Sequence, residues 1–321
     1  MSLISLLTAY SEASAEALSP LTFHLSSLAL YINWNPDGII IDGLPFRWYS
    51  MMFLIGFTIG YFIFKKYLIR EKAPLEWLDS LLMYMVIATI LGARLGHCIF
   101  YDWDYYSQHP LEMILPVKFD PFRFTGFQGL ASHGGAIGIV FALWLWTRNH
   151  YKGQIFWVLD RMVIPTAMVG GFIRLGNLFN SEIVGQPTEQ PWGFIFRQLG
   201  EDFARHPVQL YESISYFLIF VLLSWMYWKT DARLKRGRLF GMFFLTIFGA
   251  RFLLEFVKRS QGGFEDALGG VLTTGQWLSI PLILMGLYFV LRPMKKQPEY
   301  VFQQPKQRAT TTKSKRKKAK K

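Results

Sequence analysis

Long apolar stretches separated by short polar connectors dominate the chain between residues 49 and 292. A helix crosses a bilayer core about 30 Å thick with roughly 20 mostly apolar residues, and stretches of about this length recur along the chain. The predicted spans are 49–68, 78–100, 130–147, 157–179, 209–228, 239–257 and 274–292. A backbone in hydrocarbon must satisfy its own hydrogen bonds, so each span is predicted to be a helix. We expect an all-α integral membrane protein with about seven transmembrane helices and short extracytoplasmic arms.

The charges on the connectors predict the orientation of the helices. Lysine and arginine concentrate in the connectors after the first, third and fifth spans and in the terminal run KSKRKKAKK. Acidic residues between the spans lie mostly in the connectors after the second, fourth and sixth spans. Because basic residues mark the cytoplasmic side of a membrane protein, we expect the N-terminus outside and the C-terminus in the cytoplasm.

Composition agrees with this topology and divides the chain into three segments. Hydrophobic residues make up 52% of the chain and charged residues only 17%, which is typical of a membrane protein. The net charge of +12 lies in predicted cytoplasmic segments, so we expect no nucleic-acid partner. Residues 1–48 are predicted to be an interfacial segment, and 1–20 lack the positive n-region of a cleaved signal peptide. Residues 49–292 form the predicted transmembrane catalytic domain, and 293–321 a disordered basic tail attracted to anionic lipid.

The cysteine and histidine residues give no sign of a metal or redox centre. Cys98, the single cysteine, lies inside the second span and is predicted to be a small core residue. The six histidines are scattered without the spacing of metal ligands. We therefore expect no metal and no cofactor.

Four arginines lie inside the predicted spans, where a charge is expensive unless it is paired or hydrated. They are Arg94, Arg161, Arg174 and Arg251. Arg161 follows Asp160 near a cytoplasmic edge, where it can snorkel or form an ion pair, and a structural role explains it.

The run around Arg174 suggests a phosphate site at the outer end of the fourth span. Arg174, Asn177 and Asn180 recur in steps of three, which keeps them on one face of a helix, and Glu182 follows at the helix exit. A forked cation beside two amides suits a phosphate at headgroup depth. A network that only packs helices together would use the same side chains, and the pattern alone leaves both interpretations open.

The sixth and third spans carry further candidates at the same predicted depth. Arg251 and Glu255 are four residues apart, so they can pair with each other or border a polar cavity. The fourth and sixth spans run in the same direction, so Arg174 and Arg251 can converge on one phosphodiester. His133 begins the third span beside small residues, where it fits a general base, a phosphate donor or a packed neutral side chain.

Two further polar positions lie near the predicted outer boundary. The segment 205–212 reads RHPVQLYE, in which proline favours helix entry, and a structural junction is its simpler interpretation. Tyr49 heads the first span, where it is either an interface anchor or part of the site.

Taken together, these motifs resemble the prolipoprotein diacylglyceryl transferase family. The strongest match is the run 171–185, GFIRLGNLFNSEIVG, which is similar to the family signature. Ser132-His133-Gly134-Gly135, the segment 205–207 and Arg251 to Glu255 support it, in the family's order, over roughly residues 45–292.

The resemblance implies transfer of the diacylglyceryl group of phosphatidylglycerol to a lipobox cysteine thiol. A thioether forms and glycerol phosphate leaves, so the implied partners are phosphatidylglycerol, the signal peptide of a prolipoprotein and membrane lipid. The implied location is the bacterial inner membrane, which the chain crosses several times. The thiolate comes from the substrate, and the enzyme stabilises the departing phosphate.

The resemblance also implies roles for individual residues. Arg174 and Arg251 are expected to hold the phosphate, and His133 to deprotonate the thiol or orient the lipid. Asn177, Asn180 and Glu182 are expected to organise the headgroup pocket. The remaining predicted substrate-binding residues are Tyr49 and Glu255.

Three positions depart from the family pattern. Ile247 replaces a frequent tyrosine, His97 replaces another, and Lys258 stands where an arginine is usual. Lysine keeps the charge but lacks the bidentate fork, so a phosphate contact at position 258 is expected to be weaker or shared with Arg259.

Two other function classes compete with the transferase. An intramembrane serine protease would need a glycine-flanked nucleophilic serine, which we do not find. A non-enzymatic seven-helix transporter or receptor would use buried arginines to line a path or bind a ligand. The distinguishing feature is depth, because an enzyme acting on headgroups gathers its polar residues near the outer face.

Overall fold

The structure, a computed structural model, describes residues 30–32, 39–41, 44–119, 122–124, 129, 131–260 and 270–297. Six helices among the described residues are long and apolar enough to cross a membrane. They are α2 (Trp48–Arg70), α3 (Glu76–Phe100), α7 (Phe156–Phe179), α8 (Val208–Lys229), α9 (Arg238–Leu254, continuing through the 3-10 turn η5, Glu255–Val257) and α10 (Thr274–Leu291). The protein is thus a multi-pass membrane protein. Most of the predicted interfacial segment 1–48 and of the basic tail 293–321 lies outside the described residues.

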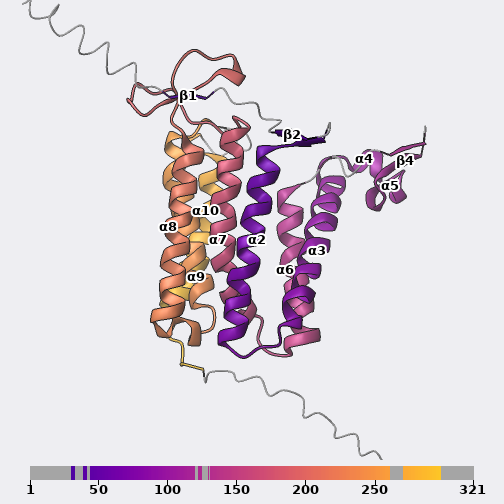
Figure 1. Cartoon of the computed structure of the whole chain (residues 1–321), viewed down its shortest axis with the longest axis vertical. Coiled ribbons are helices and arrows are strands. Elements are labelled where there is room, and N and C mark those ends of the chain that lie inside the picture. The colour runs from indigo at the N-terminus through magenta and orange to yellow at the C-terminus, as the bar shows by residue number, and fades with distance from the viewer. Residues whose placement is uncertain are drawn as a thin grey trace, which may run out of the picture.

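The remaining predicted span, 130–147, corresponds to a shorter helix. This helix, α6 (Ser132–Trp146), has 15 residues and continues directly into a π-helical turn, η2 (Thr147–Tyr151). It falls short of the length that identifies the other six spans, although it runs beside α3 in the bundle (Figure 1).

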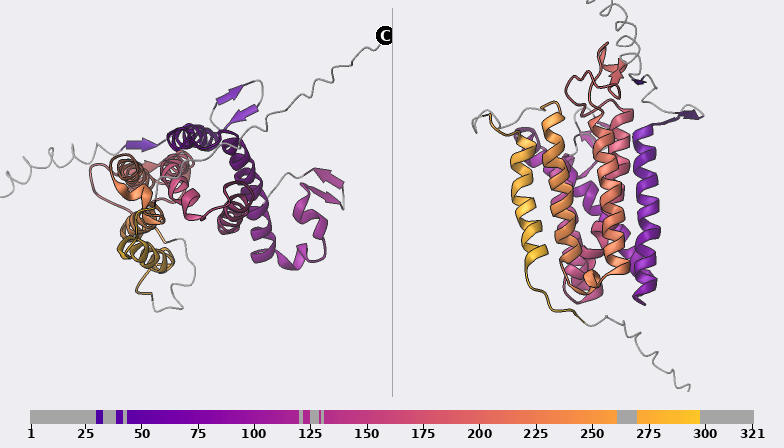
Figure 2. Two further views of the ribbon diagram at one scale, coloured as in Figure 1. Left: turned by 90° about the horizontal axis from the view of Figure 1, so that it is seen from below. Right: turned by 90° about the vertical axis from the view of Figure 1, so that its left-hand side faces the viewer.

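The helices fall into two groups (Figures 1 and 2). In the larger group α2 packs on α7, α7 on α8 and α9, and α9 on α10. In the smaller group α3 and α6 pair extensively, whereas α3 makes few contacts with α2. Seen along the helix axes, the α3–α6 pair lies to one side of α2 and α7 (Figure 2, left). The exposed faces carry large apolar side chains such as Met83 and Leu218, as expected for contact with lipid.

Glycines bring the backbones of α3 and α6 into direct contact. A Cβ atom on Gly92 would lie 2.6 Å from the carbonyl oxygen of Gly134, and one on Gly138 would lie 2.5 Å from that of Ala88. The amide of Ala131 also donates to the carbonyl of Ala93 across the pair, at 2.9 Å. Small residues at such a crossing let two transmembrane helices pack closely, so α3 and α6 form a rigid pair.

The short elements lie mainly beyond the helix ends. The antiparallel ribbons are β2 (Ile39–Ile41) with β3 (Leu44–Phe46), and β4 (Val117–Phe119) with β5 (Phe122–Phe124); β1 (Leu30–Ile32) pairs in parallel with β6 (Phe194–Phe196). The short helices are α4 (Trp103–Tyr106), α5 (Pro110–Ile114), η3 (Arg197–Leu199) and η4 (Asp231–Leu234). We call the end of the bundle that carries residues 181–207 the head end (Figure 1).

The head end is tied to the chain that follows α9. Gly185 forms a β-bridge with Lys258, and the amide of Gln186 donates to the carbonyl of Val257 at 2.9 Å. Arg205 braces this segment, because its side chain pairs with Glu201 at 2.6 Å and donates to the carbonyl of Gly185. The hydrogen bonds from Arg205 also lower the pKa of the Glu201 carboxyl below its usual value. The segment 205–207 is therefore the structural junction that its sequence indicates.

A buried ionic network closes the opposite end of the bundle. Glu71, at the end of α2, pairs with Arg161 of α7 at 2.7 Å and accepts hydrogen bonds from Trp157 at 2.8 Å and Tyr227 of α8 at 2.7 Å. Asp160 does not pair with Arg161 but accepts the backbone N–H groups at the start of α9, those of Gly237 and Phe240. The structural role expected for Arg161 is thus confirmed, with Glu71 as its partner.

Arg94, the intramembrane arginine of α3, anchors the arm formed by α4 and α5. Arg94 is buried and donates to the Tyr106 hydroxyl at 3.0 Å and to the carbonyl of Glu112 at 2.8 Å. Cys98, one turn further along α3, is fully buried, in agreement with its predicted place in the core.

Candidate functional site

Polar side chains, four of them buried, gather at the head end of the bundle. They come from the last turns of α7, the turn after it, the first turns of α8 and the end of α9. We call this set the head-end network, and its members are Arg174, Asn177, Asn180, Glu182, Glu212, Glu255 and Lys258. The members of this network therefore lie together at one end of the bundle, where an enzyme acting on headgroups needs them, while the pair of Glu71 and Arg161 lies at the other end.

The residues of α7 form one continuous chain of contacts, as their spacing predicts. Arg174 donates from Nη1 to the side-chain oxygen of Asn177 at 3.3 Å, and Asn177 donates to Glu182 at 3.0 Å. Asn180 donates to the other carboxylate oxygen of Glu182 at 3.1 Å. Two amides thus hold Glu182, and one of them also contacts the arginine.

The turn that carries Glu182 has an unusual backbone. Ser181 and Ile183, which flank it, have φ angles of 53° and 58°, in the left-handed region that is uncommon for residues other than glycine. The amide of Glu182 donates to the carbonyl of Asn177 at 2.9 Å, which returns the chain onto the helix end. Strained backbone of this kind gathers at functional sites, where surrounding contacts hold it in place.

A buried carboxylate from α8 joins Arg174 to the end of α9. Glu212 is fully buried, and its Oε2 lies 2.8 Å from Nε of Arg174. Its Oε1 lies 3.7 Å from Nζ of Lys258, which also lies 3.4 Å from Oε2 of Glu255. Glu212 and Lys258 are both nearly inaccessible to solvent, so these are ion pairs in a low-dielectric environment.

A polar stripe on α8 faces α7. It consists of Gln209, Glu212, Ser213 and Tyr216, all of which are buried. Gln209 donates to the carbonyl of Glu182 at 2.6 Å, and Ser213 donates to that of Gly171 at 2.9 Å. The spacing of these positions places them on one face of the helix, so α8 supplies a polar wall to the head-end network.

Tyr49 packs directly against the run that carries Arg174. A Cβ atom on Gly176 would lie 2.9 Å from Cδ2 of Tyr49, so the ring occupies the space that glycine leaves free. Trp48 also stacks on Phe179, with 5.4 Å between ring centroids. The start of α2 is thus fitted to the end of α7, with Tyr49 at the network.

Arg251 lies in the last turn of α9, and Tyr216 of the polar stripe lies near both Arg251 and Arg174. Within the described part of the chain Arg251 forms no ion pair, because Glu255 contacts Lys258 instead. Of the two arrangements open from sequence, a polar site bordered by Arg251 and Glu255 fits better than a direct pair.

His133 lies outside the head-end network. It is exposed at the start of α6, where its ring contacts those of Phe100 and Tyr101, with centroids 5.2 and 5.6 Å away. The ring of His97 also stacks on that of Tyr101, with centroids 5.8 Å apart. The histidine thus belongs to the α3–α6 pair and not to the α7–α9 site.

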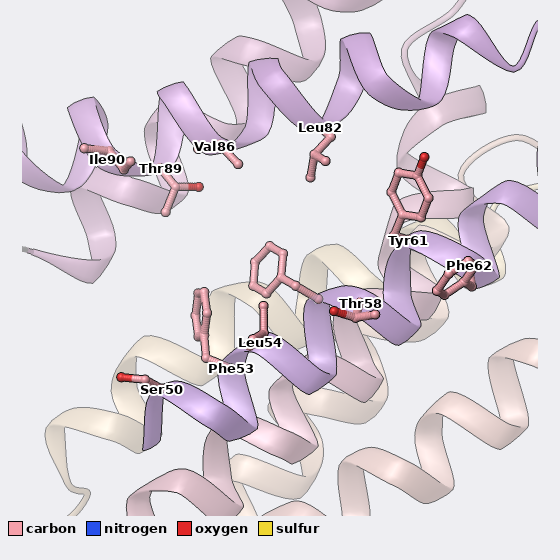
Figure 3. Close-up of a pocket in the computed structure, with 11 residues that line it drawn as sticks. Ser50, Phe53, Leu54, Thr58, Tyr61, Phe62, Leu82, Val86, Thr89 and Ile90 are labelled. Carbon is pink, nitrogen blue, oxygen red and sulfur yellow. The ribbon is translucent and has the colours of Figure 1, made fainter. Parts of the chain in front are cut away.

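An apolar groove runs between α2 and α3, in the gap between the two helix groups. Its volume is about 560 Å³, and the labelled side chains in Figure 3 line it from both helices. One end of the groove is at Ser50, the residue after Tyr49, and from there it follows the helices toward Tyr61 and Leu82. The groove therefore has one end at the first turn of α2 and continues from there along the apolar faces of α2 and α3.

Comparison with known proteins connects this geometry to a family. The family model described as prolipoprotein diacylglyceryl transferase matches residues 37–292. The chain belongs to the prolipoprotein diacylglyceryl transferase family.

Curated relatives extend the match over almost their whole length. A protein of Tolumonas auensis is 43% identical over 82% of this chain and 98% of its own. Others, from Chloroherpeton thalassium and Bacteroides fragilis, are 43% and 40% identical over 83% and 85% of this chain, and 96% and 99% of their own. All three are named phosphatidylglycerol–prolipoprotein diacylglyceryl transferase. The resemblance inferred from the motifs is thereby confirmed.

The sequence patterns do not predict the contribution of α8 to the site. Glu212 is the last residue of the segment 205–212, whose simpler interpretation is a structural junction, and no motif includes Tyr216. The available signal was the recurrence of polar residues on one face of an apolar helix, at positions 209, 212, 213 and 216. At position 258 the sequence predicts a weaker or shared phosphate contact, whereas the structure buries Lys258 between two carboxylates.

Proposed function

We propose that this chain transfers the diacylglyceryl group of phosphatidylglycerol to the lipobox cysteine of a prolipoprotein signal peptide. The observation that carries the proposal is the head-end network, in which the guanidinium of Arg174, two amides and a second cation, Lys258, come together. An apolar groove starts at Ser50, next in sequence to Tyr49, which packs on the arginine-bearing run. A phospholipid needs this combination, because its charged head and its acyl chains must be bound side by side. The family match supports the same reaction.

The reaction exchanges one bond at a glycerol carbon for another. The sulfur of the cysteine attacks the carbon that carries the phosphate ester, a C–S bond forms, and the C–O bond to phosphate breaks. The thiol proton leaves to a base, and glycerol phosphate departs with the bonding electron pair. Charge develops on the phosphate oxygens, so fixed cations next to them lower the barrier.

The residues of the site take distinct roles in this reaction. Arg174 and Arg251 bind the phosphate, and Glu182, held by Asn177 and Asn180, binds the glycerol hydroxyls of the headgroup. Tyr49 and Glu255 border the same pocket. His133 lies on the α3–α6 pair, so its role in taking the thiol proton requires the peptide to bind between that pair and the network.

The acyl chains fit the groove between α2 and α3. Its lining is almost wholly apolar, and its volume of about 560 Å³ is of the order needed for parts of two chains. The occupant that we propose is the lipid substrate, entering sideways from the membrane with its head toward Tyr49.

The topology that accompanies this function has seven spans. With α6 and η2 counted as the third span, the N-terminus lies outside and the C-terminus in the cytoplasm of a bacterial inner membrane. The head end then faces the outer leaflet, where a signal peptide and its cysteine emerge. The basic connectors at the opposite end support this orientation.

The direct test is transfer of acyl-labelled diacylglyceryl from phosphatidylglycerol to a lipobox peptide by the purified protein. We expect the wild type to label the peptide and Arg174→Ala to lower kcat/KM by roughly 100-fold or more, because it removes a phosphate ligand. Arg148→Ala is the matched control, because Arg148 is an exposed arginine after α6, and this variant should retain the wild-type rate.

Two results would contradict the proposal. A folded wild-type protein that labels no peptide would exclude the function itself. Full activity of Arg174→Ala would leave the function standing but remove Arg174 from phosphate binding.

A further inference from the structure

Glu212 is the most deeply buried charged group of the head-end network, and the reaction as written above gives it no direct part. Its exposed fraction is 0%, and it comes from the polar stripe of α8, not from the signature run on α7. A carboxylate buried this completely is stable only if cations compensate it. Its two oxygens contact cations from two other elements, Arg174 and Lys258.

The contact with Arg174 involves a particular edge of the guanidinium. Glu212 lies against Nε, at 2.8 Å, and Asn177 accepts from Nη1. The contact is an ion pair and not a hydrogen bond. Because guanidinium is a rigid planar fork, a charge held against its Nε restricts the directions in which the two terminal nitrogens point. The remaining N–H bonds of those terminal nitrogens are the ones that bind a phosphate in the bidentate manner.

The contact with Lys258 keeps Glu212 from cancelling the charge of Arg174. Lys258 is itself fixed by the β-bridge from its backbone to Gly185, and its Nζ lies 3.7 Å from Glu212 and 3.4 Å from Glu255. Because the carboxylate of Glu212 is shared between two cations, Arg174 retains attraction for an anion. A lysine suits this position, since a compact ammonium can lie between two carboxylates.

We propose that Glu212 is a positioning residue for phosphate binding, which clamps the Nε edge of Arg174 and is itself held by Lys258. The inference rests on the proposed function, since it assigns the ligand of Arg174 as the lipid phosphate. Glu212 touches no substrate and acts through the guanidinium. The polar wall of α8 is thus part of the phosphate site and not only a helix-packing surface.

The test compares two buried glutamates at opposite ends of the bundle. Glu212→Gln removes the charge without changing the shape, and Glu71→Gln is the matched control, because Glu71 is also a buried partner of an arginine. For each variant we measure kcat and KM for phosphatidylglycerol, the Kd of dioctanoyl phosphatidylglycerol, and the midpoint of thermal unfolding in detergent.

We expect Glu212→Gln to raise the Kd and lower kcat/KM by at least roughly tenfold, because a misaimed arginine binds the phosphate poorly. Glu71→Gln should lower the unfolding midpoint and leave kcat/KM within about twofold of the wild type. Wild-type Kd and kcat/KM for Glu212→Gln would overturn the proposal. It would also be overturned if the two variants lost binding in proportion to their loss of thermal stability.

A conservative pair at position 258 tests the second half of the clamp. Lys258→Arg retains the cation and is expected to keep lipid binding within roughly threefold, whereas Lys258→Met should weaken it as Glu212→Gln does. Equal binding by both variants would exclude Lys258 from the clamp. The Kd is measured without peptide, so it tests the positioning role separately from the transfer reaction. A wild-type protein that binds the lipid but transfers nothing would contradict the proposed function, and the Kd values of the variants would still decide the role of Glu212. If the wild type binds no lipid, both fail.

Discussion

Single residues at the head end are placed with little freedom. Glu182 is flanked by two residues in the left-handed backbone conformation and accepts hydrogen bonds from two side-chain amides. Arg174 forms an ion pair with Glu212. When the side chains of a binding site are already held in place, they lose little entropy on binding, and the site selects its ligand by geometry. Small changes in side-chain position are therefore expected to affect the reaction more than stability.

The contact between Tyr49 and Gly176 gives a prediction at this scale. In Gly176→Ala the added Cβ would lie 2.9 Å from the Tyr49 ring and 3.3 Å from its Cα, so the start of α2 must move. We expect kcat/KM for transfer to fall by roughly tenfold, because reacting groups tolerate little displacement. Gly249→Ala is the control, since a Cβ there meets nothing within 4 Å. Equal kinetics for both variants would show that Tyr49 does not shape the site.

The sequence predicted part of this site because its pattern is local. Arg174, Asn177 and Asn180 recur along one helix face, and that spacing alone brings them together. The pairings of Glu212 with Arg174 and with Lys258 join three separate elements, so no local spacing reveals them. The distance of His133 from this network is likewise a matter of tertiary packing, which its motif does not encode.

At the scale of elements, α7 and the α3–α6 pair have distinctive packing. α7 is the most deeply buried of the six long spans, and the α3–α6 pair is held by backbone contact between glycines. The predicted spans match these helices closely; for example, 157–179 corresponds to Phe156–Phe179. The pairing of β1 with β6 joins residues far apart in sequence, so no local pattern predicts it. The ribbons and the short helices of the arm have only three to five residues each, too few to show a period.

The α3–α6 contact gives a prediction that neighbouring glycines can test. In Gly134→Ala the new Cβ would lie 2.4 Å from the carbonyl oxygen of Gly92, whereas in Gly135→Ala it meets Ala93 at an ordinary 3.6 Å. We expect the first variant to be destabilised by about 1–3 kcal/mol, the usual cost of overpacking, and the second to be nearly neutral. Thermal unfolding in detergent measures the difference. Equal midpoints would contradict the close backbone contact.

At the scale of the whole molecule, polar groups are divided between the two ends. At the opposite end, Arg161 donates to Glu71 in a buried ion pair. At the head end, by contrast, Arg251 is half-buried and Glu182 is exposed. At the end that holds Glu71, an aromatic cluster in which Trp77 contacts Trp146 and Trp157 joins the α3–α6 pair to α7. The pair is thus attached at one end and separated from α2 by the apolar groove.

The groove gives the prediction at this scale. Val86→Trp adds a large ring to the α3 wall, opposite the side chains of α2, and fills space assigned to acyl chains (Figure 3). We expect KM for long-chain phosphatidylglycerol to rise by roughly tenfold, because the groove no longer accepts the chains. Leu218→Trp, on an exposed position of α8, is the control and should behave as the wild type. An unchanged KM for Val86→Trp would place the chains elsewhere.

The central claim is tested most directly by a product balance. Purified protein is incubated with phosphatidylglycerol and a lipobox peptide, and mass spectrometry measures both the modified peptide and the free glycerol phosphate. The account predicts one diacylglyceryl thioether on the cysteine for each glycerol phosphate released, and neither product from a peptide with serine in place of that cysteine. A folded protein that forms no thioether, or that releases glycerol phosphate without modifying the peptide, would contradict it.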